Sequence, residues 1–255
     1  MLPKKISDIL NERIPLDYSK RYCEKFNAYD NSGLLVNTGK DVKKILFSLD
    51  LSMRAVKKAI DTGANMIITH HPCIFNPLSS LDETDAVTVC IENGVSVYSM
   101  HLNLDVATDG IDERLAKMLG AESFGVCEEV YDNVGYGKVF LVEETTLDEF
   151  VAKIKKDFNT ERVLFYGDGK HKVRRVGSFC GGGSSIAVKY CDAVDTVVTC
   201  DAPHHIILRL TEKNKNVILL THYASETYPF KGVYAELKDA FDGVKCEFFI
   251  DERFI

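Results

Sequence analysis

Short apolar runs alternate along this chain with amphipathic stretches of helical period. In the first half, strands are predicted at 44–50, 66–69 and 95–100, and helices at 53–62, 84–93 and 111–119. Gly63, Gly94 and Gly120 follow the three predicted helices, and glycine is a common residue just past a helix end. Strands that alternate with helices are typical of βαβ units, so a largely parallel sheet is expected.

The second half repeats this alternation. Its predicted strands lie at 137–143, 162–166, 173–180, 195–199, 216–221 and 245–251, and its predicted helices at 146–158, 184–191, 205–213 and 230–241. No element is predicted for the irregular stretch 121–136. We therefore expect an α/β fold with two similar, interlinked lobes of mostly parallel sheet, at about 1–125 and 126–255. Terminal elements can pass from one lobe to the other.

The ends of the predicted strands carry a repeated motif. One strand leads into His101 and, four residues later, Asp105; another leads into His222 and Glu226. Upstream of each motif, a strand ending in threonine leads into a polar cluster: His70-His71-Pro72 in the first half and the stretch 200–205 in the second. The repeat suggests two related halves that face each other across a pseudo-twofold axis.

The composition of the chain indicates which binding partners and which cellular compartment to expect. The chain has 255 residues and a formal net charge of −7, which does not favour nucleic acid as a partner. Its 8 cysteines form no C-x-x-C pair, and the first residues contain no apolar signal segment. No apolar run reaches the roughly 18 residues of a membrane span. A reduced cytoplasmic protein without a membrane partner is expected.

Histidines gather where the predicted strands end. Six of the 7 histidines lie there, the exception being His171, and they are His70, His71, His101, His204, His205 and His222. Ligands of open α/β sheets bind at the carboxyl ends of strands, so this clustering favours a metal site in the cleft between the lobes. Imidazole with carboxylate suits Zn, Fe, Mn, Co or Ni. Because strand neighbours point in opposite directions, His70 and His71 favour two divalent ions rather than one.

Four segments occur in order along the chain: DNSGL at 30–34, ITHHP at 68–72, HLNLD at 101–105 and THYASE at 221–226. Together they resemble the Nif-three-like family, whose members are dinuclear-metal-centre hexameric proteins or type 2 homologues of GTP cyclohydrolase I. The resemblance implies a homohexamer and a set of metal ligands, namely His70, His71, Asp105, His222 and Glu226. It runs from about residue 6 to the C-terminus, without the central domain inserted in longer members.

Other residues near these motifs each have a functional and a purely structural interpretation. His101 is a candidate catalytic residue that shuttles protons or supports a ligand, or else an imidazole that ties down the strand end. By resemblance, His205 matches a histidine near the cavity; alternatively, His204 and His205 simply begin a helix after Pro203. Cys200 stands where the family usually has glycine. The glycine run 181–183 is a tight turn or, through its amides, an anion site.

Two classes of function remain open. The first is a metal-dependent hydrolase that uses a metal-bridging water on a small-molecule substrate, a nucleotide or phosphoester, with GTP ring opening implied by the resemblance. The second is a non-catalytic metal-binding hexamer with a regulatory or scaffold role. If His222 and Glu226 both bind metal, the chain after residue 221 has to enter a helix, because residues four apart then share a face.

Overall fold

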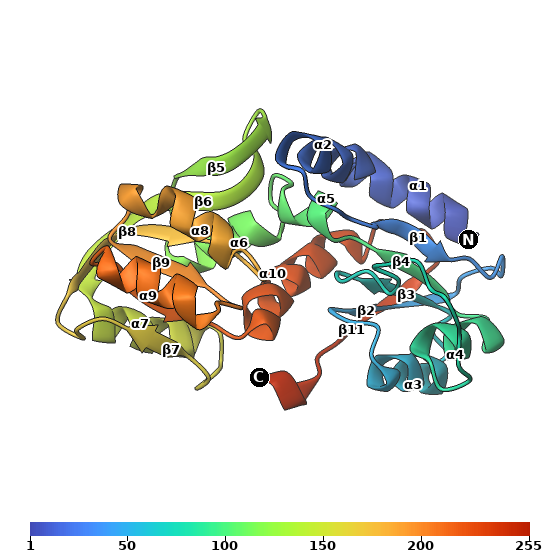
Figure 1. The fold of residues 1–255 in the computed structure, drawn as a ribbon. Helices are drawn as coiled ribbons and strands as arrows, with labels where there is room; N and C mark the ends of the chain where they lie inside the picture. The colour runs from blue at the N-terminus through green and yellow to red at the C-terminus, as the bar shows by residue number, and fades with distance from the viewer. The chain divides into compact units, whose positions relative to one another are not determined.

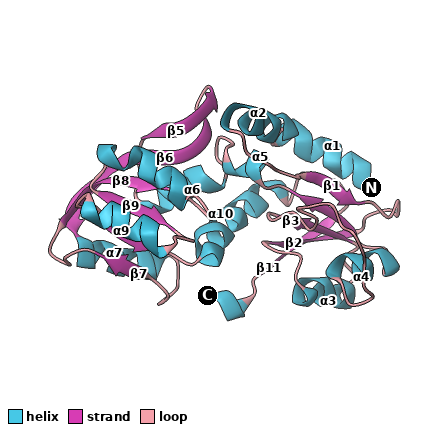
Figure 2. Ribbon diagram, viewed as in Figure 1, coloured by secondary structure: helices cyan, strands magenta, loops and turns pink.

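Two β-sheets organise the chain (Figures 1 and 2). The computed structural model describes all residues, 1–255. Its contacts define two compact units: unit 1 is Met1–Leu104 with Phe230–Asp251, and unit 2 is Asp105–Pro229 with Glu252–Ile255. No helix is long and apolar enough to cross a membrane.

The sheet of unit 1 has five strands in the order β1-β4-β3-β2-β11. They are β1 (Gly33–Val36), β2 (Lys44–Ser48), β3 (Met66–Thr69), β4 (Ser96–Ser99) and β11 (Lys245–Phe249). Only β1 is antiparallel to its neighbour, so the expected parallel sheet is confirmed here. Strands β3 and β4 are buried along their whole length, as apolar strands covered on both faces should be.

Helices cover both faces of this sheet. On one face, Val56 of α3 (Met53–Thr62) and Val87 of α4 (Ala86–Glu92) join Leu46 and Ile67 in one buried cluster. On the other, the ring of Phe47 lies 6.0 Å from that of Phe230. Two N-terminal helices, α1 (Pro3–Arg13) and α2 (Leu16–Phe26), were not predicted. The available signals were Pro3 at the start of α1 and the buried pair Ile6 and Leu10, one turn apart.

The sheet of unit 2 has six strands in the order β5-β6-β8-β9-β10-β7. They are β5 (Phe124–Tyr131), β6 (Val134–Thr146), β7 (Leu164–Tyr166), β8 (Lys172–Ser178), β9 (Thr196–Thr199) and β10 (Asn216–Leu219). Only β8, β9 and β10 pair in parallel; the other three pairings are antiparallel. The expectation of a mostly parallel sheet is therefore wrong for this unit.

A hairpin accounts for one of the three antiparallel pairings. Strands β5 and β6 are joined by a two-residue turn, Asp132 and Asn133, whose φ angles are 46° and 66°. Positive φ angles at both residues give the turn a twist that matches the twist of the two strands. The stretch 121–136, for which no element was predicted, thus contains β5 and the turn. The helices that lie wholly in unit 2 are α6 (Ile111–Leu119), α7 (Leu147–Asp157), α8 (Ser184–Tyr190) and α9 (His204–Glu212), with short 3₁₀ turns at Cys191–Ala193 and Glu252–Phe254.

The two sheets share one core topology. Strands β1 to β4 lie in the order β1-β4-β3-β2, and strands β7 to β10 lie in the matching order β7-β10-β9-β8, with the same parallel and antiparallel senses. A strand that follows each core pairs with the sheet of the other core: β6 with β8, and β11 with β2. The similar lobes are confirmed in this sense.

Each unit consists of two separate segments of the chain. Residues 105–125 belong to unit 2 and residues 230–251 to unit 1, whereas the sequence suggested a boundary near residue 125. The C-terminal segment belongs to unit 1 because β11 pairs in parallel with β2 and so covers the backbone edge of that strand.

Unit 2 also buries an ion pair. Nζ of Lys138 lies 3.4 Å from Oδ2 of Asp112, and neither side chain is more than 1% exposed. Burial raises the pKa of Asp112, against the opposing effect of Lys138 and of the amides of Cys180 and Gly137. The amide of Gly137 donates to Asp112 at 2.6 Å. This pair therefore ties α6 to β6 within the core.

Candidate metal centre

Three of the predicted histidines come together in unit 1. His70 and His71 directly follow β3, and His101 follows β4, the neighbouring parallel strand. One ligand atom from each of the three lies within 4.8 Å of the others. The amides of both His70 and His71 donate to the carbonyl of Leu49, at 3.1 and 3.0 Å. The chain therefore turns immediately after Thr69, which lets the adjacent histidines escape the alternation of a regular strand.

Each of these imidazoles is held through the same ring nitrogen. Nδ1 of His70 lies 2.7 Å from the carbonyl oxygen of Met100. Nδ1 of His71 lies 2.7 Å from Oδ1 of Asp50, and Nδ1 of His101 lies 2.8 Å from Oδ1 of Asp30. Carbonyl and carboxylate oxygens only accept, so Nδ1 carries the proton and a neutral ring keeps its lone pair on Nε2. Metal-binding histidines are oriented in this way.

Asp30 is an ionised anchor for His101. Burial alone raises the pKa of Asp30, but hydrogen bonds from His101, Ser19 and Ser32 outweigh that effect and lower the pKa to about 2. Ser32 also accepts the amide of His101 at 3.0 Å. The turn at 30–33, singled out in the sequence only through the resemblance, thus positions His101 by its side chain and its backbone.

In unit 2, a helix brings His222 and Glu226 together. Helix α10 (His222–Leu237) begins three residues after β10, and Oγ1 of Thr221 accepts the amide of Ala224 at 3.1 Å as its cap. Nε2 of His222 lies 3.1 Å from Oε2 of Glu226, one turn along. The helical turn expected for these two residues is therefore confirmed. The predicted start at residue 230 was wrong, because α10 continues through Pro229.

His222 follows the pattern of the other three imidazoles. Its Nδ1 lies 2.6 Å from Oδ2 of Asp201, which directly follows Cys200 at the end of β9. Sequence reasoning placed Asp201 in a polar cluster without a role and did not single out Asp50. Both residues lie just beyond the ends of strands, and this position could have identified them as candidate site residues.

Asp105 lies at the end of the short helix α5 (Leu102–Asp105) and is 4% exposed. Sγ of Cys180 is 3.6 Å from its Oδ1. Burial, reinforced by the charges of Asp105 and Asp112, raises the pKa of the Cys180 thiol well above its usual value. Burial also raises the pKa of Cys200. Burial therefore favours the neutral thiol over the thiolate at both positions.

The repeated histidine motifs are not equivalent residue by residue. The strand register pairs Thr69 with Ser99, and Thr199 with Leu219. His101 comes two residues after Ser99, whereas His222 comes three residues after Leu219. The position that matches His101 is therefore Thr221, and the second histidine lies one step later, on the helix itself. The repeat holds for the strands, but the histidines that follow them are displaced by one position.

The remaining histidines lie elsewhere. His204 and His205 are exposed in the first turn of α9, directly after Pro203, as the helix-start reading expected. His171 lies in a loop, with Nδ1 3.2 Å from Oδ1 of Asn216. Neither group joins the three-histidine cluster of unit 1.

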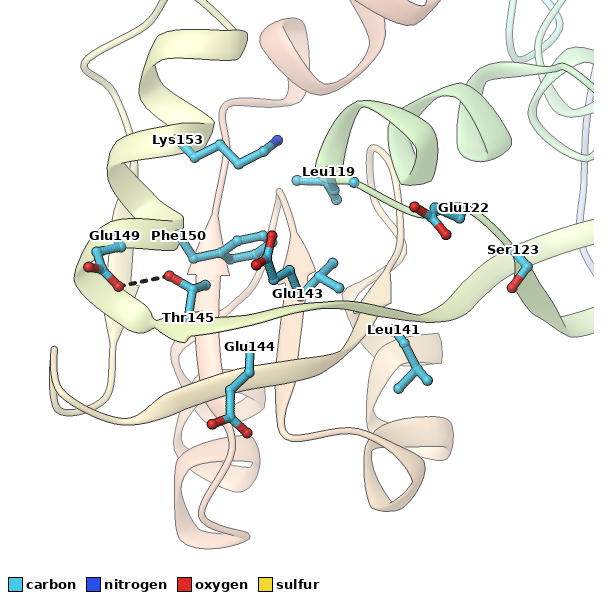
Figure 3. A pocket seen from close by; sticks show the side chains of 12 residues that line it. Leu119, Glu122, Ser123, Leu141, Glu143, Glu144, Thr145, Glu149, Phe150 and Lys153 are labelled. Atoms are coloured by element: carbon cyan, nitrogen blue, oxygen red, sulfur yellow. Dashed lines mark hydrogen bonds between the residues drawn. The ribbon is translucent and has the colours of Figure 1, made fainter.

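A cavity of unit 2 is a different site. It measures about 870 Å³ and lies along β6 and α7, where Leu119, Glu143, Phe150 and Lys153 line it (Figure 3). None of the predicted metal residues lines this cavity. Glu149, at its edge, accepts hydrogen bonds from Thr145 and Thr146 at the start of α7 and is committed to capping that helix.

Two related α/β units, with imidazoles and carboxylates at the ends of parallel strands, define a class of candidate metal-binding α/β proteins. The family model described as Duf34/NIF3 (NGG1p interacting factor 3) matches residues 1–253, and the chain belongs to this family. The resemblance seen in the sequence motifs is thereby confirmed.

Named relatives agree with this assignment. A "GTP cyclohydrolase 1 type 2 homolog" of Lactococcus lactis is 32% identical over 213 residues, which cover 79% of each chain. The "NGG1-interacting factor 3" of Saccharomyces cerevisiae is 27% identical over 248 residues, covering 86% of this chain and 85% of the relative.

Solved structures share the fold. Staphylococcus aureus protein SA1388 superposes with a TM-score of 0.84 at 24% identity, covering 99% of this chain and 97% of the other. Reduced HcgD from Methanocaldococcus jannaschii superposes with a TM-score of 0.79 at 25% identity, covering 97% of each chain. These likenesses extend over nearly the whole chain, so both units belong to the shared fold.

Proposed function

We propose that this protein is a hydrolase that depends on two divalent metal ions, with His70, His71, Asp105, His222 and Glu226 as the ligands. The ions are drawn from Zn, Fe, Mn, Co and Ni, which suit a donor set of imidazole and carboxylate.

One observation carries the proposal. All four imidazoles of the candidate site, His70, His71, His101 and His222, are held through Nδ1 by a carbonyl or carboxylate oxygen at 2.6 to 2.8 Å. A histidine that only packs or only caps a strand has no reason to repeat one tautomer and one orientation four times. Ligation through Nε2 explains the arrangement of His70, His71 and His222, because the Nδ1 partner fixes the ring and raises the basicity of the ligating nitrogen. In His101 the same arrangement leaves Nε2 available for proton transfer.

The chemistry follows from this arrangement. Two divalent ions held by these residues would supply Lewis acidity and would activate water as a nucleophile at neutral pH. His101 contributes proton transfer at Nε2, because the ionised Asp30 behind its Nδ1 stabilises the protonated ring. We infer a small-molecule substrate, a nucleotide or another phosphoester, in keeping with the relatives named GTP cyclohydrolase 1 type 2 homologs.

The test is metal loading followed by turnover. Purified chain reconstituted with each of Zn²⁺, Mn²⁺, Fe²⁺, Co²⁺ and Ni²⁺ should retain up to two ions per chain after desalting. The loaded protein should then hydrolyse one member of a panel of nucleotides and phosphoesters. Metal content near zero with every ion contradicts the proposal at its first step.

A second candidate is a non-catalytic metal-binding assembly. The yeast relative is named for an interaction rather than for a reaction, which favours this reading. For either candidate we propose a homohexamer, to be checked by sedimentation at micromolar concentration. Metal-loaded hexamer without turnover on any substrate of the panel would favour the assembly role over the hydrolase.

A further inference from the structure

Gly181 lies against two of the candidate ligands in unit 2. It belongs to the turn 180–183, between β8 and α8, and has a φ of +51°. A Cβ atom at Gly181 would lie 2.3 Å from Oε1 of Glu226 and 3.1 Å from Nε2 of His222. A Cβ atom at the next residue, Gly182, would have no other atom within 4 Å. The close approach is therefore a property of Gly181 and not of the whole glycine run.

The backbone of this turn is held from several sides. The hydroxyl of Tyr136 donates to the carbonyl of Cys180, and the amide of Cys180 donates to Oδ1 of Asp112 at 3.3 Å. The amide of Asp201 donates to the carbonyl of Gly181 at 3.4 Å. A side chain at position 181 consequently cannot relieve its collision by shifting the turn. The group that yields is the end of the Glu226 side chain, which rotates about its own bonds.

We infer that Gly181 is a positioning residue for the metal centre: its missing side chain is what lets the Glu226 carboxylate lie beside Nε2 of His222. The inference rests on the proposed metal-binding function. A methyl group at position 181 pushes the carboxylate away from the imidazole and spoils a shared coordination geometry. A substitution that disturbs how a metal ligand is positioned typically weakens metal binding by about 10- to 100-fold.

The first experiment compares three alanine substitutions. Gly181→Ala adds both a collision and a strained φ. Gly243→Ala adds a similar strain at a φ of +71°, with nothing within 4 Å of the new atom, and Gly182→Ala adds neither. We expect the affinity for Zn²⁺, measured against a competing chelator, to fall at least about tenfold in Gly181→Ala only. The visible absorption of bound Co²⁺ should change in the same variant, since its coordination geometry changes.

A rescue separates positioning from general damage. Shortening the carboxylate in Glu226→Asp removes the atom that the new methyl group meets. The double variant Gly181→Ala/Glu226→Asp should therefore bind Zn²⁺ more tightly than Gly181→Ala, although Glu226→Asp alone weakens binding. If Gly181→Ala does not fold, the double variant should restore folding for the same reason.

The outcomes are distinct. Wild-type affinity in Gly181→Ala, or a double variant that is no better than Gly181→Ala in folding and in binding, overturns the inference and leaves the proposed function standing. Absence of Zn²⁺ and Co²⁺ binding by the wild-type chain overturns the proposed function and the inference with it.

Discussion

Nε2 of His222 lies 3.1 Å from Oε2 of Glu226, on the first turn of α10, while Nδ1 of the same ring lies 2.6 Å from Asp201. One imidazole thus stands between two carboxylates. Because Nδ1 donates its proton to Asp201, the lone pair of a neutral Nε2 and the Glu226 oxygen repel each other unless a proton or a cation lies between them. This relationship makes Glu226 the most informative single position of the site.

Removal of the charge on Glu226 should reduce the number of metal ions that the chain binds. Glu226→Gln keeps the shape of the side chain but not its negative charge, which offsets the repulsion between two close cations. We expect a folded protein that loses at least one of two ions, measured by elemental analysis, together with any hydrolytic activity. Asp105→Asn should behave similarly. His171→Ala is the matched control and should keep full occupancy; two ions in Glu226→Gln would exclude it as a bridging ligand.

His101 should affect turnover without affecting metal content. His101→Ala is expected to retain both ions and to lose about 10²- to 10⁴-fold in kcat, the usual contribution of a positioned acid or base. The comparison of metal stoichiometry with kcat checks this directly. If one ion disappears with the imidazole, His101 is a ligand instead, as its closeness to His70 and His71 also allows.

The pH profile should report on Asp30. The pKa of Asp30 is lowered to about 2, so its carboxylate stays charged at every working pH and stabilises the protonated form of His101. Asp30→Asn removes that charge and lowers the pKa of His101. If His101 acts as a base, activity rises with pH through this pKa, and the rising limb should move to lower pH in Asp30→Asn. A limb that does not move would mean that another group is the base.

Chelation should lower the thermal stability of the protein. A ligand that binds only the folded chain, at about 100 times its Kd, stabilises it by about 2.7 kcal/mol. We expect Tm to fall after treatment with a chelator and to return when metal is restored. Glu226→Gln should show a smaller response than wild type, and an equal response in both would place the stabilising metal elsewhere.

The buried ion pair of unit 2 should matter for stability alone. Lys138→Met leaves the Asp112 carboxylate buried without its cation, which costs about 3–5 kcal/mol of unfolding free energy. The double variant Asp112→Leu/Lys138→Met should recover part of this loss in denaturant titrations. Lys172→Met breaks the exposed pair with Glu144 and should change stability by about 1 kcal/mol or less. A similar loss in both single variants would contradict the importance of burial.

Elements with strong local signals were predictable from the sequence. The bounds of α3, β3 and α6 agree residue for residue with the prediction, Met53–Thr62, Met66–Thr69 and Ile111–Leu119. Ser52 caps α3, and Gly63 and Gly120 end their helices with positive φ. Such signals act between residues a few positions apart, so they are visible in the chain itself. The histidines and acidic residues at strand ends were visible for the same reason.

The features that only the tertiary structure revealed depend on contacts between segments that are distant in the sequence. The pairing of β11 with β2 joins residues about 200 positions apart, and nothing local at Lys245 specifies it. Asp50 and Asp30 become partners of His71 and His101 only because separate strands and turns end at one edge of a sheet. The closeness of Gly181 to Glu226 likewise arises from the packing of a turn against a helix. The sequence by itself determined which chemical groups are available and where the strands end; folding decided which groups meet, because long-range distances are set by the packing of the whole unit.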